Sequence, residues 1–268
     1  MNYDSPSRGA TWLAALTSGA APLPDYPASV RVVDALLAGQ PARYIAVVPD
    51  AGSRYPRARN GEVGLIEGWS LAQAVHEAIA ADRDSPKRAI VAVVDVSSQA
   101  YGRREEAFGI HEALAGAAGA YAQARLAGHP VIGLIIGKAM SGAFLAHGYQ
   151  ANRLIALNDA GVMVHAMGKA AAAKVTLRSI DDLERLAANV PPMAYDIANY
   201  ASLGLLWKLL DVADPDRPGE GDLASVRKAL EAALRDIADD PQRDLSSRLG
   251  GVNRQASSRV REKLAAQW

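Results

Sequence analysis

A chain of 268 residues can bury roughly 70 to 75% of its unfolded surface, so it can build a sizeable core without disulfides or structural metals. Its 29 Lys and Arg residues balance its 29 Asp and Glu residues, which leaves no excess positive charge to neutralise a nucleic-acid backbone. The absence of cysteine excludes disulfides, thiolate metal sites and cysteine nucleophiles, and it fits a reducing cytoplasm.

Neither an export signal nor a membrane span is expected. The first ten residues include Asp4 and Arg8 and have no apolar core, unlike a secretory signal. The longest apolar stretch, 131–146, is interrupted by Lys138 and by glycines, and it is shorter than the ~20 residues that a membrane helix needs. We therefore predict a cytoplasmic protein.

Short apolar runs rich in β-branched residues alternate with longer helical patterns through the first part of the chain. In chain order, the predicted strand and helix pairs are 44–48 with 69–80, 90–96 with 107–126, and 131–136 with 141–150, followed by strands 153–157 and 162–165. This alternation predicts an α/β fold whose strands are buried on both faces.

The remainder of the chain is predicted to be mainly helical. Apolar spacing of three and four indicates helices over 181–189, 194–210, 223–238 and 256–267, separated by segments rich in proline and glycine. We expect a single domain over 1–268, composed of an N-terminal helical extension (1–40), an α/β core (41–177) and a helical C-terminal region (178–268) that packs on the sheet or on a partner.

The most informative stretch runs from Gly137 to Gly142, where an apolar strand ends in a turn of small residues before a helix. Ser141 is a favourable N-cap for that helix. The backbone N–H groups of Ala139, Met140 and Gly142 are expected to point outward, where they could hold an anion or a developing oxyanion. The alternative is that the glycines serve only close packing of strand and helix.

A second buried strand ends at Asp95 and leads into a polar loop. Because the carboxyl ends of parallel strands meet at one edge of a sheet, this loop and the Gly137–Gly142 turn should converge, as an oxyanion hole requires. We predict no metal ligands. The candidate catalytic residues are Ser98, Gln99, Ala139, Met140, Ser141 and Gly142, and the candidate substrate-binding residues are Tyr101, Gly102, Gly137, Lys138 and His165.

From about residue 90 to 205 the sequence resembles the carboxyltransferase branch of the crotonase superfamily. The resemblance rests on Asp95, Glu105-Glu106, Gly137, Ser141-Gly142-Ala143 and the strand 153–158. Upstream, the run 56–69 is similar to the signature of malonate decarboxylase gamma subunits, which do not use biotin. The resemblance implies a crotonase/ClpP-like ββα superhelix of carboxyltransferase type with a helical C-terminal region.

The same resemblance implies a function within a complex. It implies a heterodimer with a beta subunit of like fold, together with an acyl carrier protein subunit and an acyltransferase alpha subunit. The implied reaction is decarboxylation of a malonyl thioester, carried on the CoA-like prosthetic arm of the acyl carrier protein, to the acetyl thioester and CO2. Backbone donors would hold the enolate intermediate, and neither biotin nor any other cofactor is expected on this chain.

Two departures from biotin-using relatives stand out. These relatives carry Gly-Gly where this chain has Ala139-Met140, and Thr-Pro-Gly where it has Val96-Ser97-Ser98. A methionine side chain at position 140 would hinder the close approach of a biotin ring. We therefore expect this half-site to have lapsed or to have been refitted.

Other interpretations remain open. The turn also resembles ClpP-type serine peptidases, with Ser141 and His165 as a nucleophile–base pair, but the register places Met140 at the nucleophile position and turns Ser141 by about 100°. A non-catalytic structural half of a complex is a further alternative.

The arginines of the 54–59 loop and the remaining histidines have two interpretations at most. Arg54, Arg57 and Arg59 form either a solvated loop or a contact for a phosphate-bearing arm or an acidic partner. The remaining histidines, His76, His111, His129 and His147, are expected to be surface or structural residues.

Overall fold

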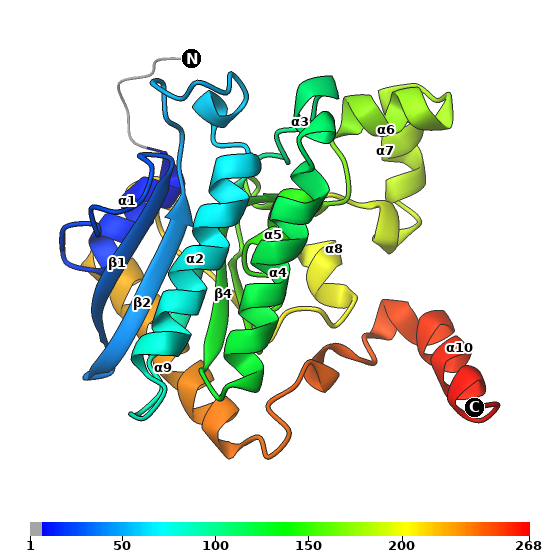
Figure 1. Cartoon of the computed structure of the whole chain (residues 1–268). Helices are drawn as coiled ribbons and strands as arrows, with labels where there is room; N and C mark the ends of the chain where they lie inside the picture. Colours follow the sequence, from blue (N-terminus) through cyan, green and yellow to red (C-terminus); the bar gives the residue numbers. More distant parts are fainter. Residues whose placement is uncertain (1–6) are drawn as a thin grey trace.

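The computed structural model describes residues 7–268, and within them seven strands form one sheet with helices on both faces (Figure 1). The order across the sheet is β1-β2-β3-β4-β5-β7, and β6 pairs with the far end of β4. The β1–β2 pair is antiparallel and the other pairs are parallel. The strands are β1 (Val30–Leu37), β2 (Gln40–Val47), β3 (Ala89–Val96), β4 (Val131–Met140), β5 (Arg153–Leu157), β6 (Met163–His165) and β7 (Lys208–Leu210).

Helices α2 and α4 lie side by side on one face of the sheet, and α1 and α9 pack on the other (Figure 1). Within the described part of the chain, no helix combines the length and the hydropathy that crossing a bilayer requires. The helices are α1 (Arg8–Leu16), α2 (Leu65–Ala81), α3 (Arg103–Ala107), α4 (Ile110–Leu126), α5 (Ser141–Ala146), α6 (Lys169–Thr176), α7 (Ile180–Ala187), α8 (Ile197–Ser202), α9 (Glu220–Asp239) and α10 (Gln255–Ala265). Short 3-10 helices occupy Ala58–Asn60, Pro191–Met193, Ser246–Arg248 and Val252–Arg254.

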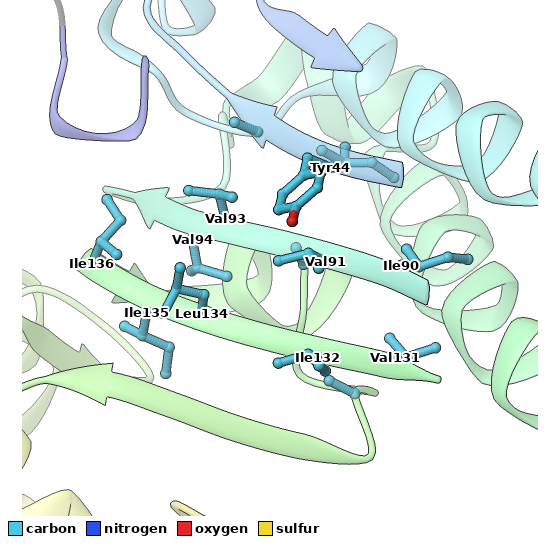
Figure 2. Packing of buried hydrophobic residues seen from close by; sticks show 14 of the residues in the cluster. Tyr44, Ile90, Val91, Val93, Val94, Val131, Ile132, Leu134, Ile135 and Ile136 are labelled. Carbon is cyan, nitrogen blue, oxygen red and sulfur yellow. The ribbon is translucent and has the colours of Figure 1, made fainter. Parts of the chain in front are cut away.

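The central strands are buried on both faces, as the apolar runs predict. Figure 2 shows Tyr44, Val91, Ile132 and their neighbours stacking from strand to strand in the core. Each buried valine or isoleucine side chain contributes about 1.5 to 3 kcal/mol relative to an exposed one. This core therefore fixes the strand ends that carry the candidate site. It confirms the predicted α/β class.

The predicted N-terminal extension over 1–40 is wrong as a purely helical segment. Residues 1–6 lie outside the described part of the chain, and helix α1 is followed by strand β1. Ala38 and Gly39 both have positive φ, which suits a tight hairpin turn, and β1 buries Val30, Val32 and Val33 against the core. Pairing with β2 satisfies backbone groups that a helix here would have left on an open sheet edge.

The predicted helix over 194–210 is also wrong in extent. Helix α8 ends at Ser202, Gly204 adopts φ +71°, and residues 208–210 form β7. Strand β7 adds to the open edge of β5, which provides hydrogen-bond partners that an isolated helix could not supply to the sheet. Helix α6 (Lys169–Thr176) has no counterpart among the predicted elements. The other predicted helices of the C-terminal region are confirmed, and α9 packs back on the sheet.

His147 is a fully buried structural residue rather than a surface one. Its Nδ1 lies 3.0 Å from the Tyr121 hydroxyl and its Nε2 lies 3.1 Å from the Val93 carbonyl oxygen. A neutral ring satisfies both contacts, because Nε2–H donates to the carbonyl while Nδ1 accepts from the tyrosine. Burial lowers the pKa of His147 from 6.5 to about 4. The residue therefore ties α4 and α5 to β3 only while it is uncharged.

We predict that His147 makes the fold sensitive to acid. Since the folded-state pKa is below the unfolded one, its stabilisation is full above about pH 6.5 and is lost as the pH falls towards 4. The contribution between pH 7 and pH 5 should be about 2 kcal/mol. Denaturant unfolding should show His147→Gln to be less stable than wild type at pH 7 and to lose less stability on going to pH 5. An identical pH slope in the two proteins would contradict this assignment.

Candidate active site

Most of the predicted site residues gather around two adjoining pockets that share Ser141 and Ala166. The first, here called the loop pocket, has a volume of about 430 Å³ and is lined by Ser98, Gln99 and Tyr101 together with α6 and the segment before it. The second, here called the apolar pocket, has a volume of about 330 Å³ and is lined by a set that includes Ala139, Gly142 and His165. The structure thus brings the loop after β3 and the start of α5 to one place, as expected from the parallel sheet.

The loop after β3 is held by the 56–69 segment. The Val63 N–H donates to the Ser98 carbonyl oxygen over 3.0 Å, and the Ala100 N–H donates to the Val63 carbonyl oxygen over 2.7 Å. The Arg57 guanidinium lies over the Tyr101 ring, 4.7 Å from its centre. The 56–69 run therefore has a physical role, which is to fix the backbone on which Gln99 stands.

A buried carboxylate anchors that same segment to the body of the protein. Glu67 is 1% exposed, and its two oxygens accept hydrogen bonds from the Gly64 N–H over 3.0 Å and from the Ser29 hydroxyl over 2.6 Å. The first of these bonds caps the start of α2. The second ties α2 to the residue that precedes β1.

The turn before α5 differs from the prediction. Strand β4 continues to Met140, where Ala139 lies in register with Val96 of β3 and Val164 of β6, and Met140 lies in register with His165. Ala139 and Met140 therefore belong to the sheet rather than to the open turn that the sequence predicted. Strand β6 is what extends the sheet at this point.

Ser141 does not cap α5 as predicted. It is the first residue of the helix, it has φ +59°, and the capping position falls on Met140, which makes no side-chain cap. A left-handed conformation at a residue other than glycine costs of order 1 kcal/mol or more and persists only where the surroundings impose it. Here the end of β4 and the start of α5 impose it.

The Met140 side chain does not obstruct either pocket. Met140 is 5% exposed and lines neither one, whereas Ala139 and Ser141 on either side of it line the apolar pocket. Strand alternation explains this, because successive side chains at the end of β4 point to opposite faces. Met140 therefore closes neither of these two pockets, and its effect on a biotin ring stays a prediction.

The Gly142 N–H group already has a hydrogen-bond acceptor within the chain. Its N–H donates to the Gln99 side-chain oxygen Oε1 over 2.9 Å. A Cβ atom at position 142 would overlap that oxygen, so glycine is required for the contact. This bond connects the loop pocket to the apolar pocket.

Gly137, Lys138 and Gly102 lie apart from the two pockets. Gly137 and Lys138 line a third pocket with Arg8 and Asp95, and Gly102 is the capping residue of α3. The Asp95 carboxylate accepts hydrogen bonds from the Gly9 N–H over 3.2 Å and the Lys138 N–H over 3.1 Å. Asp95 and Gly137 thus join α1 to the ends of β3 and β4. The structure does not bring Gly102, Gly137 and Lys138 together with the other candidates, and their contact with substrate stays a prediction.

His165 stands at the side of the apolar pocket. Its ring stacks on Tyr195 with centres 3.9 Å apart, and its Nδ1 lies 3.0 Å from the Met167 carbonyl oxygen. Burial lowers the pKa of His165, which keeps the ring neutral at pH 7. Its ring makes no hydrogen bond with the Ser141 hydroxyl, although both residues line the pocket. The nucleophile–base pair of a peptidase is therefore not formed.

Sequence reasoning missed the walls of both pockets. Tertiary packing supplies these residues, and no local pattern distinguishes them from core or surface positions. In the loop pocket they include Ala166, Met167, Gly168, Ala171, Lys174 and Val175, and in the apolar pocket Phe144, Leu145, Tyr149, Tyr200, Leu203 and Leu205.

The arginines of the 54–59 loop make local contacts. Arg57 pairs with Glu62 over 3.2 Å, the Arg59 side chain donates to the Ser53 carbonyl oxygen over 2.8 Å, and Arg54 lies over the Tyr55 ring. Of the three, Arg57 stands beside the loop pocket, since it stacks on Tyr101.

The chain matches the family model of the malonate decarboxylase gamma subunit over residues 58–268. It is 66% identical to a chain of a Pseudomonas malonate decarboxylase hetero-tetramer solved with coenzyme A, with a TM-score of 0.95 over 98% of this chain and 100% of that one. It is 64% identical to a chain of the Pseudomonas MdcD–MdcE hetero-dimer, with a TM-score of 0.91 over 98% and 99% of the two chains.

More distant relatives share part of the chain or the fold alone. The malonyl-S-ACP:biotin-protein carboxyltransferase MADD of Malonomonas rubra is 36% identical over 165 residues, which are 60% of this chain and 56% of that protein. The chain thus spans little more than half the length of that relative. A transcarboxylase 12S chain, 20% identical, has a TM-score of 0.64 over 89% of this chain and 45% of its own, which supports the predicted carboxyltransferase-type fold.

We predict that Gly137→Ala will destabilise the chain by about 2 kcal/mol, because its new Cβ would overlap the Asp95 carboxylate at the junction of β3, β4 and α1. Gly119→Ala is the matched control. A Cβ at this position of α4 meets no atom within 4 Å, so this change should be neutral or stabilise by up to about 1 kcal/mol. Denaturant unfolding of the two variants tests the pair, and equal stabilities would contradict the role given to Asp95.

Proposed function

The chain belongs to the family of malonate decarboxylase gamma subunits, and on that basis we propose that it acts as one half of a heterodimer with a beta subunit of like fold. Together the two subunits decarboxylate a malonyl thioester to the acetyl thioester and CO2, which makes the complex a carbon–carbon lyase. The observation that carries the proposal is the family match over 58–268, together with the two pockets that meet at Ser141.

The reaction sets clear physical demands. When the bond to the carboxylate breaks, its electron pair moves onto the thioester carbonyl and forms an enolate, and the enolate carbon then takes up a proton to give the acetyl group. Fixed hydrogen-bond donors at the enolate oxygen lower the barrier by about 3 to 4 kcal/mol each. An apolar surrounding also favours departure as neutral CO2, because a carboxylate loses hydration there.

The two pockets fit these demands in part. Phe144, Leu145 and Leu203 give the apolar pocket hydrophobic walls, and neutral His165 stands beside them as a candidate proton carrier. Lys174 on the loop pocket and nearby Arg57 offer cations for the phosphate of a CoA-like arm. We propose that an acyl carrier protein presents the substrate on such an arm, that an acyltransferase alpha subunit completes the complex in the cytoplasm, and that neither biotin nor another cofactor binds this chain.

The C-terminal helix α10 supports the proposal that this chain binds a partner subunit. Helix α10 extends away from the body of the molecule (Figure 1), and none of its residues is buried. Val260 and Leu264 form an apolar stripe four residues apart and Trp268 follows it, all of them exposed. An amphipathic helix of this kind gains stability when its apolar side is covered by another chain. We assign this helix to the interface with the beta subunit.

The function is tested by purifying the chain alone, its beta subunit alone and the two co-expressed, and by measuring CO2 release from a malonyl thioester on the acyl carrier protein. We expect turnover by the complex and little or none by the isolated chain, since the apolar pocket and the loop pocket are both open to solvent in a single chain. Turnover by the isolated chain at the rate of the complex would refute the shared site. Ser141→Ala should leave the turnover of the complex within about threefold, because the His165 ring makes no hydrogen bond with the Ser141 hydroxyl.

The helix assignment is tested by Leu264→Asp, which places a charge in the apolar stripe. We expect the affinity for the beta subunit to fall at least tenfold, because a carboxylate buried without a partner is costly. The thermal stability of the isolated chain should not change, because Leu264 is 51% exposed and contributes nothing to its core. Ser258→Asp introduces the same charge about 120° around the helix from Leu264 and serves as the control. Equal affinities for the two variants, measured by titration calorimetry, would remove α10 from the interface.

A further inference from the structure

The Gln99 side chain has one end fixed and one end free. Its oxygen accepts the Gly142 N–H over 2.9 Å, which decides the orientation of the amide, because the NH2 group cannot face another N–H donor. None of the described residues pairs with the Gln99 nitrogen Nε2. Gln99 also lines the loop pocket beside Ser98, Tyr101 and Ser141. An oriented pair of N–H donors is thus left at the boundary of the two pockets.

The backbone that carries Gln99 is held from two sides. Residue 99 forms a parallel bridge with Val63, and the neighbouring Ala100 N–H is bonded to the Val63 carbonyl oxygen. Next along the loop, Tyr101 is covered by the Arg57 guanidinium. A donor on such a support needs little reorganisation when charge develops opposite it, which is the condition for electrostatic catalysis.

The bond to Gly142 also changes the strength of the donor. A hydrogen bond accepted at an amide oxygen polarises the group and strengthens the bond that its NH2 donates, by about 10 to 30% in condensed phase. The glycine amide at the start of α5 therefore acts on the pocket through the Gln99 side chain, even though its own N–H is occupied.

We propose that Gln99 is a catalytic residue of this chain, whose Nε2 donates to the thioester oxygen as it becomes the enolate oxygen. The assignment rests on the proposed function and deepens it, since it names a side-chain donor where backbone amides were predicted. The electron pair released by the departing CO2 reaches the thioester oxygen, and the Gln99 N–H stabilises it there until the enolate carbon is protonated. Gly142 and the 56–69 segment are positioning elements that act through Gln99.

Two substitutions at position 99 test the donor in the assembled complex. Gln99→Leu removes both ends of the amide, and Gln99→Glu retains an acceptor for the Gly142 N–H while it loses the N–H donors. We expect kcat for CO2 release to fall by about 10²-fold or more in both variants, with KM changed less than threefold, because the bond strengthens only in the transition state. Glu106→Gln, on the exposed side of α3, is the control and should match wild type.

Gly142→Ala tests the relay without touching Gln99 itself. This variant retains its backbone N–H, but its new Cβ would overlap Gln99 Oε1 and displace the side chain. We expect a loss of kcat similar to that of Gln99→Leu. Melting temperature and size-exclusion profile are measured for every variant, so that a loss of folding or assembly is separated from a loss of chemistry.

The outcomes separate the two proposals. A wild-type complex that releases no CO2 would defeat the proposed function and this assignment with it. An active wild-type complex in which Gln99→Leu keeps its kcat, or raises KM alone, would defeat only the assignment to Gln99. Full activity of Gly142→Ala would show that the bond between Gly142 and Gln99 is not part of the site.

Discussion

The hydrogen bond from the Gly142 amide to the Gln99 side chain joins the two strand ends on which the candidate site is built. One partner stands at the start of α5, directly after β4, and the other stands on the loop after β3. A side chain at position 142 would overlap the Gln99 oxygen, so the bond as it stands needs glycine there. It also needs the loop after β3 to stay in place, and the backbone hydrogen bonds of Val63 to Ser98 and Ala100 hold that loop. Both pockets take their shape from this junction, since Gln99 lines one of them and Gly142 the other.

The junction in turn depends on the length of strand β4, which continues to Met140. Strand β4 runs past its apolar core, pairs with the short strand β6 and then turns abruptly at Ser141. Asp95 and Gly137 secure the same edge from the opposite side by tying α1 to the strand ends. Strain at Ser141 is thus carried by the paired ends of β3, β4 and β6.

Much of the architecture could be predicted from the sequence. The alternation of apolar runs with helical patterns gave strands β2 to β6 and the long helices α2, α4 and α9, because burial on both faces leaves an unbroken apolar signature. The convergence of the two loops at one edge was also predictable, since parallel strands impose it. Predictions failed at the two edges of the sheet. Strand β7 pairs with β5, which lies far earlier in the chain, so its local composition does not indicate the edge that it completes. Strand β1 pairs with β2 across the hairpin turn at Ala38 and Gly39, a local signal that the prediction of a helical extension did not use.

The candidate site shows the same division. The candidate residues Gln99, Ser141, Gly142 and His165 could be named from the linear pattern, and the family could be recognised from it, because local spacing and small residues in turns leave a trace in sequence. Their roles could not, since which amides are free and which way a side chain points depend on neighbours contributed by β6, α6 and the 56–69 segment. The sequence alone therefore determined the fold class and the edge of the sheet where the candidate site lies, because the periodicity of apolar residues and the order of strands can be followed along the chain. Only the tertiary structure decided that Ala139 and Met140 belong to the sheet and that Gln99 covers the Gly142 amide, because hydrogen bonds between distant segments arise only when the chain is folded.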